Sequence, residues 1–337
     1  MRKQAILWEK ETGSAVHCFL CAHECRIKPG AFGFCGMRKN EGGELFTYAY
    51  GNVIASNVDP IEKKPFYHFL PGSTSYSIAT VGCNFRCSFC QNWSISQACV
   101  RDGANEGYEL KPEEAAREAL KAGCRSMSYT YTEPTIFFEY ALDIARIAKE
   151  KGLYNTFVTN GFMTTRAVGE MKGLIDAANV DLKFFDDASY QRVCAGRLRP
   201  VLDSIVRMKS RGLWVEVTTL VVPGENDSEQ ELRGIANFLA SVGKDIPWHL
   251  SRFHPDYKYV DARPTPFDTL EKAFAIGKEA GLKYVYLGNV AEGGGTECPA
   301  CGALLVERVG FGARVSKNFT KKGKCSGCGT VIEGVWK

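Results

Sequence analysis

The stretch Cys83-Asn84-Phe85-Arg86-Cys87-Ser88-Phe89-Cys90 decides how the rest of the chain is interpreted. It places three cysteines within eight residues, separated first by three residues and then by two. Three thiolates at this spacing can hold three irons of a cubane [4Fe–4S] cluster, which leaves the fourth iron open to a ligand. A zinc site, or a complete cluster that uses a distant fourth cysteine, is the competing interpretation.

Most of the other cysteines are also grouped. Eleven of the fourteen cysteines fall into three sets: Cys18, Cys21, Cys25 and Cys35; Cys83, Cys87 and Cys90; and Cys298, Cys301, Cys325 and Cys328. The chain begins with a short charged segment and has no apolar run long enough to span a membrane, so we expect a cytoplasmic protein without membrane contact. Grouped cysteines in such a protein indicate metal sites rather than disulfides. The formal net charge of +4 is too small to indicate nucleic-acid binding.

From residue 76 onward, short β-rich runs alternate with segments that carry helix start and stop signals. The expected strands are residues 76–81, 126–131, 153–159, 180–184, 213–222, 249–254 and 283–287. This alternation predicts an α/β fold with a parallel sheet and right-handed crossovers. About six repeats suit a partial (β/α)6 TIM-like barrel better than a closed barrel of eight.

Polar motifs follow or end the expected strands. The cysteine loop follows the first, Thr132-Glu133-Pro134 the second, Asn160-Gly161 the third, and His254 the sixth, while Asp181-Leu182-Lys183 lies in the fourth. Ligands bind at the carboxyl ends of the strands in parallel α/β folds. We therefore expect these motifs, distant in sequence, to meet at one mouth.

With these motifs the chain resembles the radical S-adenosylmethionine (SAM) superfamily, and within it the pyruvate formate-lyase activating enzyme group and its AmmeMemoRadiSam-system branch. The cysteine loop, residues 90–96 and Tyr131-Thr132-Glu133-Pro134 carry the resemblance, which extends over nearly residues 15 to 290. It implies that SAM chelates the open iron and that an electron from the reduced cluster splits it. The resulting 5′-deoxyadenosyl radical would abstract hydrogen from a substrate.

The resemblance also implies roles for individual side chains. Cys83, Cys87 and Cys90 would hold the [4Fe–4S] cluster, and the residues expected to position SAM are Phe89, Thr132, Glu133, Asn160, Asp181, Lys183 and His254. Lys183 would contact the SAM carboxylate. A lysine suits this position, since a carboxylate that chelates iron still has lone pairs for a charged donor.

Two smaller domains are expected beside the barrel of residues 76–291. Residues 1–75 would form a cysteine-rich domain whose Cys18, Cys21, Cys25 and Cys35 hold zinc or a second iron–sulfur cluster, which spacing alone does not separate. Residues 292–337 contain two Cys-x2-Cys-Gly knuckles, at Cys298 and Cys301 and at Cys325 and Cys328, which predict a zinc ribbon after a flexible seam at 293–295. The ribbon's basic residues, Lys321 among them, could meet RNA, but a zinc-stapled docking module is the favoured interpretation.

We therefore expect a radical SAM oxidoreductase of the activating-enzyme type that acts on a protein or peptide. Its electron would come from a low-potential donor of the ferredoxin or flavodoxin type. One alternative is a radical SAM enzyme that modifies tRNA, with the basic ribbon holding the nucleic acid. Another is a non-catalytic iron–sulfur electron carrier or scaffold.

Overall fold

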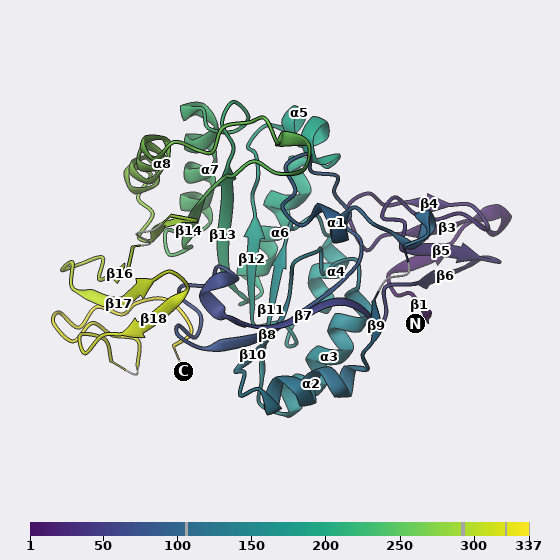
Figure 1. Ribbon diagram of the computed structural model, residues 1–337, viewed down its shortest axis with the longest axis horizontal. Coiled ribbons are helices and arrows are strands. Elements are labelled where there is room, and N and C mark those ends of the chain that lie inside the picture. The colour runs from purple at the N-terminus through teal and green to yellow at the C-terminus, as the bar shows by residue number, and fades with distance from the viewer. Residues whose placement is uncertain (105–106, 291–293, 321, 337) are drawn as a thin grey trace.

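A nine-stranded sheet forms the centre of the computed structural model, which describes residues 1–104, 107–290, 294–320 and 322–336 (Figure 1). Its order is β15-β14-β13-β12-β11-β10-β8-β7-β9. The parallel strands are β8 (Thr74–Thr80), β10 (Ser126–Tyr129), β11 (Tyr154–Thr159), β12 (Ala177–Asp181), β13 (Trp214–Val221), β14 (Trp248–Arg252) and β15 (Val285–Gly288). The antiparallel strands β7 (Asn52–Pro60) and β9 (Tyr108–Glu109) complete one edge.

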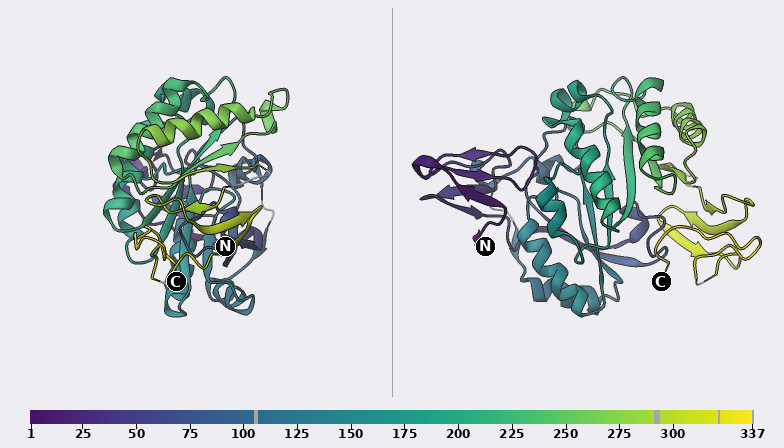
Figure 2. Two further views of the ribbon diagram at one scale, coloured as in Figure 1. Left: turned by 90° about the vertical axis from the view of Figure 1, so that its left-hand side faces the viewer. Right: turned by 180° about the vertical axis from the view of Figure 1, so that it is seen from behind.

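Helices cover one face of this sheet: they lie mostly behind the strands in Figure 1 and in front of them in the reversed view of Figure 2. They are α2 (Pro112–Lys121), α3 (Phe138–Glu150), α4 (Thr165–Glu170), α6 (Leu198–Ser210), α7 (Glu229–Val242) and α8 (Phe267–Glu279). Two of these helices begin at start signals in the sequence. Pro112 opens α2, and the Ser228 side chain accepts a hydrogen bond from the Glu231 amide at the start of α7.

The predicted α/β fold with a mostly parallel sheet is confirmed, and the sheet is open, with β15 and β9 as its edges in the described residues. Two details differ from expectation. The fourth strand ends at Asp181, so Lys183 lies in the loop that follows, where its amide donates to the Tyr190 hydroxyl at 3.0 Å. Strand β7 pairs with β8, so the sheet extends across the predicted domain boundary at residue 75.

The N-terminal segment forms two small antiparallel sheets that project from one end of the molecule (Figure 1). The first contains β1 (Lys3–Gln4), β6 (Glu44–Thr47) and β5 (Arg38–Glu41), and the second β2 (Trp8–Lys10), β3 (Val16–Cys18) and β4 (Arg26–Ile27). A buried ion pair between Arg38 of β5 and Glu139 of α3 joins the projection to the helices that cover the central sheet. Arg38 also donates to the Ile6 carbonyl oxygen at 3.0 Å.

The C-terminal segment forms a small sheet of β16 (Thr296–Glu297), β17 (Leu304–Val309) and β18 (Gly312–Val315) at the opposite end. The predicted boundary at 291/292, the start of the seam at Gly293, and Lys321 lie outside the described residues. Among the described residues, no helix combines the length and apolar character that crossing a membrane requires.

A chain of hydrogen bonds connects this small sheet to strand β15 of the central sheet. Arg308 Nη1 donates to Thr296 Oγ1 at 2.7 Å, and the Thr296 hydroxyl lies 2.9 Å from the Tyr286 hydroxyl. Tyr286 lies 2.6 Å from His68 Nε2, and His68 Nδ1 lies 2.7 Å from the Glu333 carbonyl oxygen. Because a carbonyl only accepts, His68 carries its proton on Nδ1 and accepts from Tyr286, which in turn accepts from Thr296. Burial lowers the pKa of His68 to about 4, so the ring is neutral.

Candidate functional site

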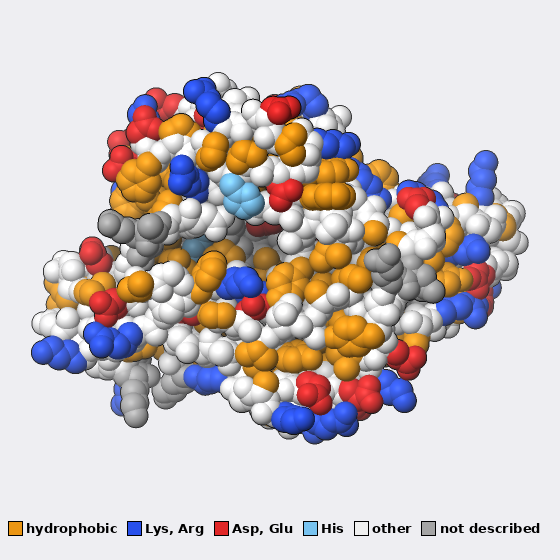
Figure 3. All heavy atoms as spheres, viewed as in Figure 1, with side chains coloured by type: hydrophobic (Ala, Val, Ile, Leu, Met, Phe, Trp, Pro, Cys, Tyr) orange, Lys and Arg blue, Asp and Glu red, His pale blue; other side chains and the backbone are white. Residues whose placement is uncertain are grey.

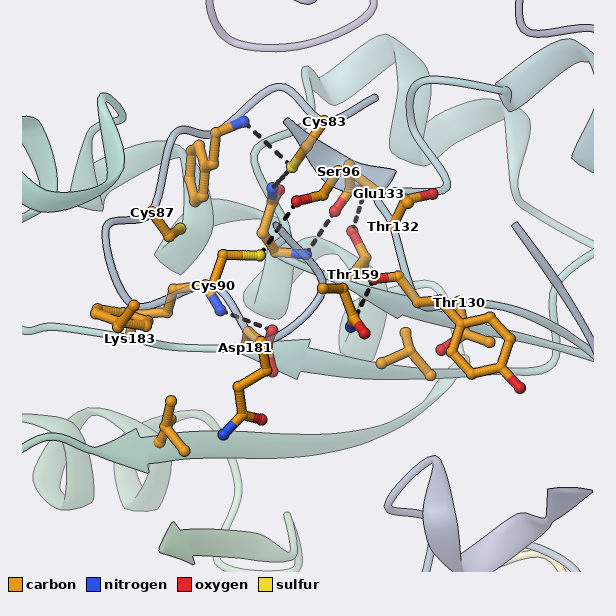
Figure 4. A pocket seen from close by; sticks show the side chains of 18 of the residues that line it. Cys83, Cys87, Cys90, Ser96, Thr130, Thr132, Glu133, Thr159, Asp181 and Lys183 are labelled. Carbon is orange, nitrogen blue, oxygen red and sulfur yellow. Dashed lines mark hydrogen bonds and ion pairs between the residues drawn. The ribbon is translucent and has the colours of Figure 1, made fainter. Parts of the chain in front are cut away.

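A cavity of about 250 Å³ lies at the carboxyl ends of the parallel strands. The face shown in Figure 3 is hollowed near its centre, and Figure 4 shows side chains of the cysteine loop and of several strand ends around the cavity. The sequence-predicted residues that line it are Cys83, Cys87, Phe89, Cys90, Thr132, Glu133, Asn160, Asp181 and Lys183. His254 is exposed and does not line the cavity, but its Nε2 lies 2.9 Å from the side-chain nitrogen of Gln91, which does.

The cysteine loop follows β8 directly and is fixed by backbone contacts. The amides of Arg86 and Ser88 donate to the carbonyl oxygens of Cys194 and Val193 at 2.8 and 3.1 Å. The buried Phe85 ring packs against Gly196, where a Cβ atom would lie only 2.3 Å from the ring. These contacts hold the loop tightly enough for three sulfurs to face one cavity.

Hydrogen-bond donors surround the sulfurs. The Phe85 amide donates to Cys83 Sγ at 3.3 Å, and Asn160 Nδ2 donates to the same sulfur at 3.8 Å. The Ser96 hydroxyl lies 3.1 Å from Cys90 Sγ. Burial raises the pKa of the Cys83 and Cys90 thiols, which disfavours free thiolates, and binding to a metal group would offset this cost.

The donor set of the loop suits a cluster better than a single ion. Cys83, Cys87 and Cys90 are all described, and their three sulfurs do not all lie within 4.8 Å of one another. A cluster of several irons spreads its ligands farther apart than one ion does, and hydrogen bonds to its sulfurs stabilise it. The loop therefore fits the [4Fe–4S] group expected from its spacing.

Glu133 is buried and connects the ends of β10 and β11. Its Oε1 accepts from the Thr135 amide and hydroxyl at 3.0 and 2.6 Å and from the Thr159 hydroxyl at 2.7 Å. Its Oε2 accepts from the Asn160 amide at 2.8 Å. Burial raises the pKa of Glu133, although these hydrogen bonds act in the opposite direction. With a single donor among the described residues, Oε2 retains a lone pair for a ligand.

Thr132 and Asn160 direct their side chains mainly to the protein. The Thr132 hydroxyl donates to the Thr80 carbonyl oxygen at 2.7 Å. Asn160 Nδ2 also donates to Asn84 Oδ1 at 2.7 Å, and its Oδ1 accepts from the Phe162 amide at 3.0 Å. Asn160 therefore ties the cysteine loop to the end of β11.

Lys183 places a cation at the cavity wall. Its Nζ lies 2.8 Å from Asp181 Oδ2 and 6.0 Å from the centre of the buried Phe89 ring. Burial alone lowers the pKa of Lys183, but the Asp181 carboxylate and the Cys87 sulfur more than offset this and raise it well above its usual value. The ammonium group is charged and can donate to an anionic ligand.

Tyr131 is a cavity residue to which sequence reasoning gave no role. Its backbone has φ +64°, in the left-handed region that favours glycine, and its hydroxyl donates to Asp59. Asp59 also accepts from Lys63 and Lys64 at 2.9 and 2.7 Å. The only signal in the sequence is the Tyr131-Thr132 pair at a strand end, because Asp59 is more than seventy residues away.

The four C-terminal cysteines form a compact group. Cys298 Sγ lies 3.6 Å from Cys328 Sγ, and Cys301 Sγ lies 3.6 Å from Cys325 Sγ. Sulfurs about 2.3 Å from one tetrahedral ion lie about 3.8 Å apart, so this set fits a single four-coordinate ion. The prediction that Cys298, Cys301, Cys325 and Cys328 form one site is thereby supported by their geometry.

Comparison with known proteins identifies the family. Residues 77–238 match the model of the radical SAM superfamily. An uncharacterized protein of Methanocaldococcus jannaschii is 43% identical over 334 residues, which cover 98% of this chain and 99% of that protein. The chain belongs to the radical SAM superfamily, and its cavity is a candidate active site of that class.

More distant relatives carry functional names. The pyruvate formate-lyase-activating enzyme of Clostridium pasteurianum is 24% identical over 203 residues, which cover 53% of this chain and 80% of that enzyme. A domain of the pyruvate-formate lyase-activating enzyme of Bacteroides vulgatus has a TM-score of 0.44 at 19% identity and covers 49% of this chain and 99% of the domain. This chain is thus similar to activating enzymes at low identity.

Proposed function

We propose that this protein cleaves SAM reductively in the cavity and uses the resulting radical to abstract hydrogen from a protein or peptide. The observation that carries the proposal is the convergence of nine predicted residues, from several strand ends, on one cavity. When bound, a [4Fe–4S] cluster with one open iron supplies the site that chelates SAM and the electron that splits it. The chain's own residues bind, orient and shield that cofactor.

Three side chains are suited to hold SAM. Lys183 offers an ammonium group to the carboxylate, and Glu133 Oε2 offers a lone pair to the amino group. Phe89 presents a buried apolar ring to the adenine. The polar side-chain atoms of Thr132 and Asn160 already have protein partners, so these residues support the site indirectly. Thr132 donates to the backbone at Thr80, and Asn160 donates to Asn84 of the cysteine loop. His254 would contact ligands at the rim through Gln91.

The protein or peptide substrate is supported by the rim of the cavity and by the names of the relatives. Trp93 follows the cysteine loop, is 43% exposed and stacks on Tyr257 with ring centres 5.2 Å apart. Aromatic surface beside an active site suits a polypeptide, which offers both apolar side chains and backbone groups. The activating enzymes among the relatives suggest a protein substrate and a ferredoxin- or flavodoxin-type electron donor.

The first experiment tests SAM cleavage. Anaerobically reconstituted protein with SAM and dithionite should release 5′-deoxyadenosine and methionine, and Cys87→Ala should abolish this release. Cys124→Ala is the matched control, because Cys124 is buried away from the cavity lining. A reconstituted protein that holds iron but releases neither product would instead be an electron carrier or scaffold.

The second experiment tests the substrate class. The enzyme is given deuterium-labelled cell protein or deuterium-labelled RNA, and the 5′-deoxyadenosine is analysed by mass spectrometry. Deuterium transfer from the protein fraction alone supports the proposal, because the radical takes its hydrogen from the substrate. Transfer from the RNA fraction alone would favour the alternative of tRNA modification.

A further inference from the structure

A second, smaller cavity lies beside the proposed active site in the N-terminal projection. It is lined by all four N-terminal cysteines, Cys18, Cys21, Cys25 and Cys35. Its other walls are mainly apolar and include Ile27, Phe34 and Ile136. All cysteines of the chain are free, so these four are not joined as disulfides. Four thiols that line one apolar cavity indicate a metal group, because thiols interact only weakly with one another, whereas their thiolates bind metals strongly.

The spacing of these sulfurs distinguishes the kind of metal group. The C-terminal cysteines lie in pairs 3.6 Å apart and all within 4.8 Å of one another, as a single ion requires. The N-terminal cysteines, which the structure describes completely, contain no set of three that meets this spacing. A group larger than one ion matches the wider arrangement, and four cysteines are the full ligand set of a [4Fe–4S] cluster.

The donors around the N-terminal sulfurs also suit such a cluster. The Phe34 amide donates to Cys25 Sγ at 3.5 Å, and Arg38 Nη1 lies 3.7 Å from Cys18 Sγ. Arg38 is only 2% exposed and is paired with the buried Glu139 carboxylate, so it contacts the cysteines as the donor end of an ion pair. Hydrogen bonds from such donors stabilise the negative charge of a cluster held by four thiolates.

The second cavity is connected to the first by short contacts. Its wall includes Thr135, whose hydroxyl donates to Glu133 of the first cavity at 2.6 Å. The Phe34 ring stacks on the His23 ring with centres 4.0 Å apart, and His23 Nε2 lies 2.7 Å from the carbonyl oxygen of Asn84. Asn84 is the neighbour of Cys83, so a continuous path leads from Cys25 to the cysteine loop.

We propose that Cys18, Cys21, Cys25 and Cys35 bind a second [4Fe–4S] cluster that relays electrons to the group held by Cys83, Cys87 and Cys90. A low-potential one-electron donor reduces the second cluster, which is reoxidised when it passes that electron on. No covalent bond is formed or broken in this electron transfer. The relay rests on the proposed function, whereas the identity of the metal group does not.

Metal analysis tests the second cluster without reference to activity. The variant Cys83→Ala/Cys87→Ala/Cys90→Ala, reconstituted anaerobically, should retain about four irons and about four sulfides per chain. After reduction it should give the EPR signal of a cluster. Zinc in place of iron, or a folded variant with neither sulfide nor EPR signal, would overturn the proposal.

A complementary measurement covers the case in which the triple variant does not fold. The unsubstituted protein should contain about eight irons per chain, whereas a protein with one cluster contains about four. Cys25→Ser should lose about half of the iron, and the matched Cys124→Ser should lose none. Four irons in the unsubstituted protein, all lost in the triple variant, would exclude the second cluster.

The relay is tested by changing the electron donor. Cys25→Ser should lose SAM cleavage driven by a reduced ferredoxin, whereas dithionite, which is small enough to reach the first cavity directly, should still support it. Equal rates of the ferredoxin-driven reaction in both proteins would overturn the relay. Failure of the proposed function looks different, because the unsubstituted protein would then release no 5′-deoxyadenosine even with dithionite.

Discussion

Replacement of Lys183 by methionine tests whether this side chain recognises the SAM carboxylate. Methionine keeps the length and apolar character of the stem and removes the ammonium group that lies 2.8 Å from Asp181. A hydrogen bond to a charged group contributes about 1.5–3 kcal/mol, which corresponds to a Kd for SAM about ten- to one-hundredfold higher. The unpaired Asp181 carboxylate would add repulsion toward the ligand's carboxylate, so the upper end of this range is expected.

Equilibrium dialysis of SAM against the oxidised, anaerobically reconstituted protein measures this Kd without turnover. Iron content is measured in parallel, because Lys183 lies near Cys87 and the comparison holds only for equal cluster loading. Lys172→Met is the control, since Lys172 is exposed and does not line the cavity. An unchanged Kd in Lys183→Met at full iron loading would refute the role of this lysine.

Three further changes test other parts of the structure. Cys301→Ala should abolish metal binding by the four C-terminal cysteines and lower the melting temperature but leave SAM cleavage with dithionite intact. Loss of cleavage in a variant that keeps the iron bound by Cys83, Cys87 and Cys90 would contradict the separation of the two sites. Arg38→Met should lower the free energy of unfolding by about 3–5 kcal/mol, because it leaves the buried Glu139 carboxylate without its cation, and urea denaturation should show part of this loss recovered in Arg38→Met/Glu139→Leu. His68 has a pKa lowered to about 4, so between about pH 6.5 and 4 the unfolded chain binds a proton that the folded chain does not. The free energy of unfolding should therefore fall with decreasing pH in this window by up to about 1.4 kcal/mol per pH unit, and a His68→Asn variant with the same slope would contradict this account.

Much of the central fold could be predicted because local signals in the sequence agree with it. Apolar strands alternate with helices that begin at Pro112 or Ser228, and such alternation leaves few topologies other than a parallel sheet. The short helix α4 and the antiparallel strands β7 and β9 were not predicted as parts of this layer. Strand β9 has two residues, and the pairing of β7 depends on contacts with β8 that no local pattern encodes.

In the candidate site, too, contacts between residues distant in sequence could not be predicted from local patterns. The polar motifs could be placed at one mouth because the carboxyl ends of parallel strands share an edge. Which atom contacts which could not be predicted: Asn160 bonds to the cysteine loop, and Tyr131 bonds to Asp59 from a distant strand. Glu216 carries a signal that went unused, since a carboxylate within the apolar strand β13 requires buried partners, which are the His249 ring and the amides of Tyr67 and His68.

The hydrogen-bond chain from Arg308 to Glu333 determines how the C-terminal sheet can move. Every donor in it points the same way, because the Arg308 guanidinium at one end can only donate and the Glu333 carbonyl at the other end can only accept. These hydrogen bonds, together with the one from Arg308 Nη2 to the Tyr67 carbonyl oxygen, oppose movement of the C-terminal sheet relative to the central sheet. A molecule bound at the hairpin tip, where Val309 is 77% exposed, would therefore be restricted in its position relative to the cavity.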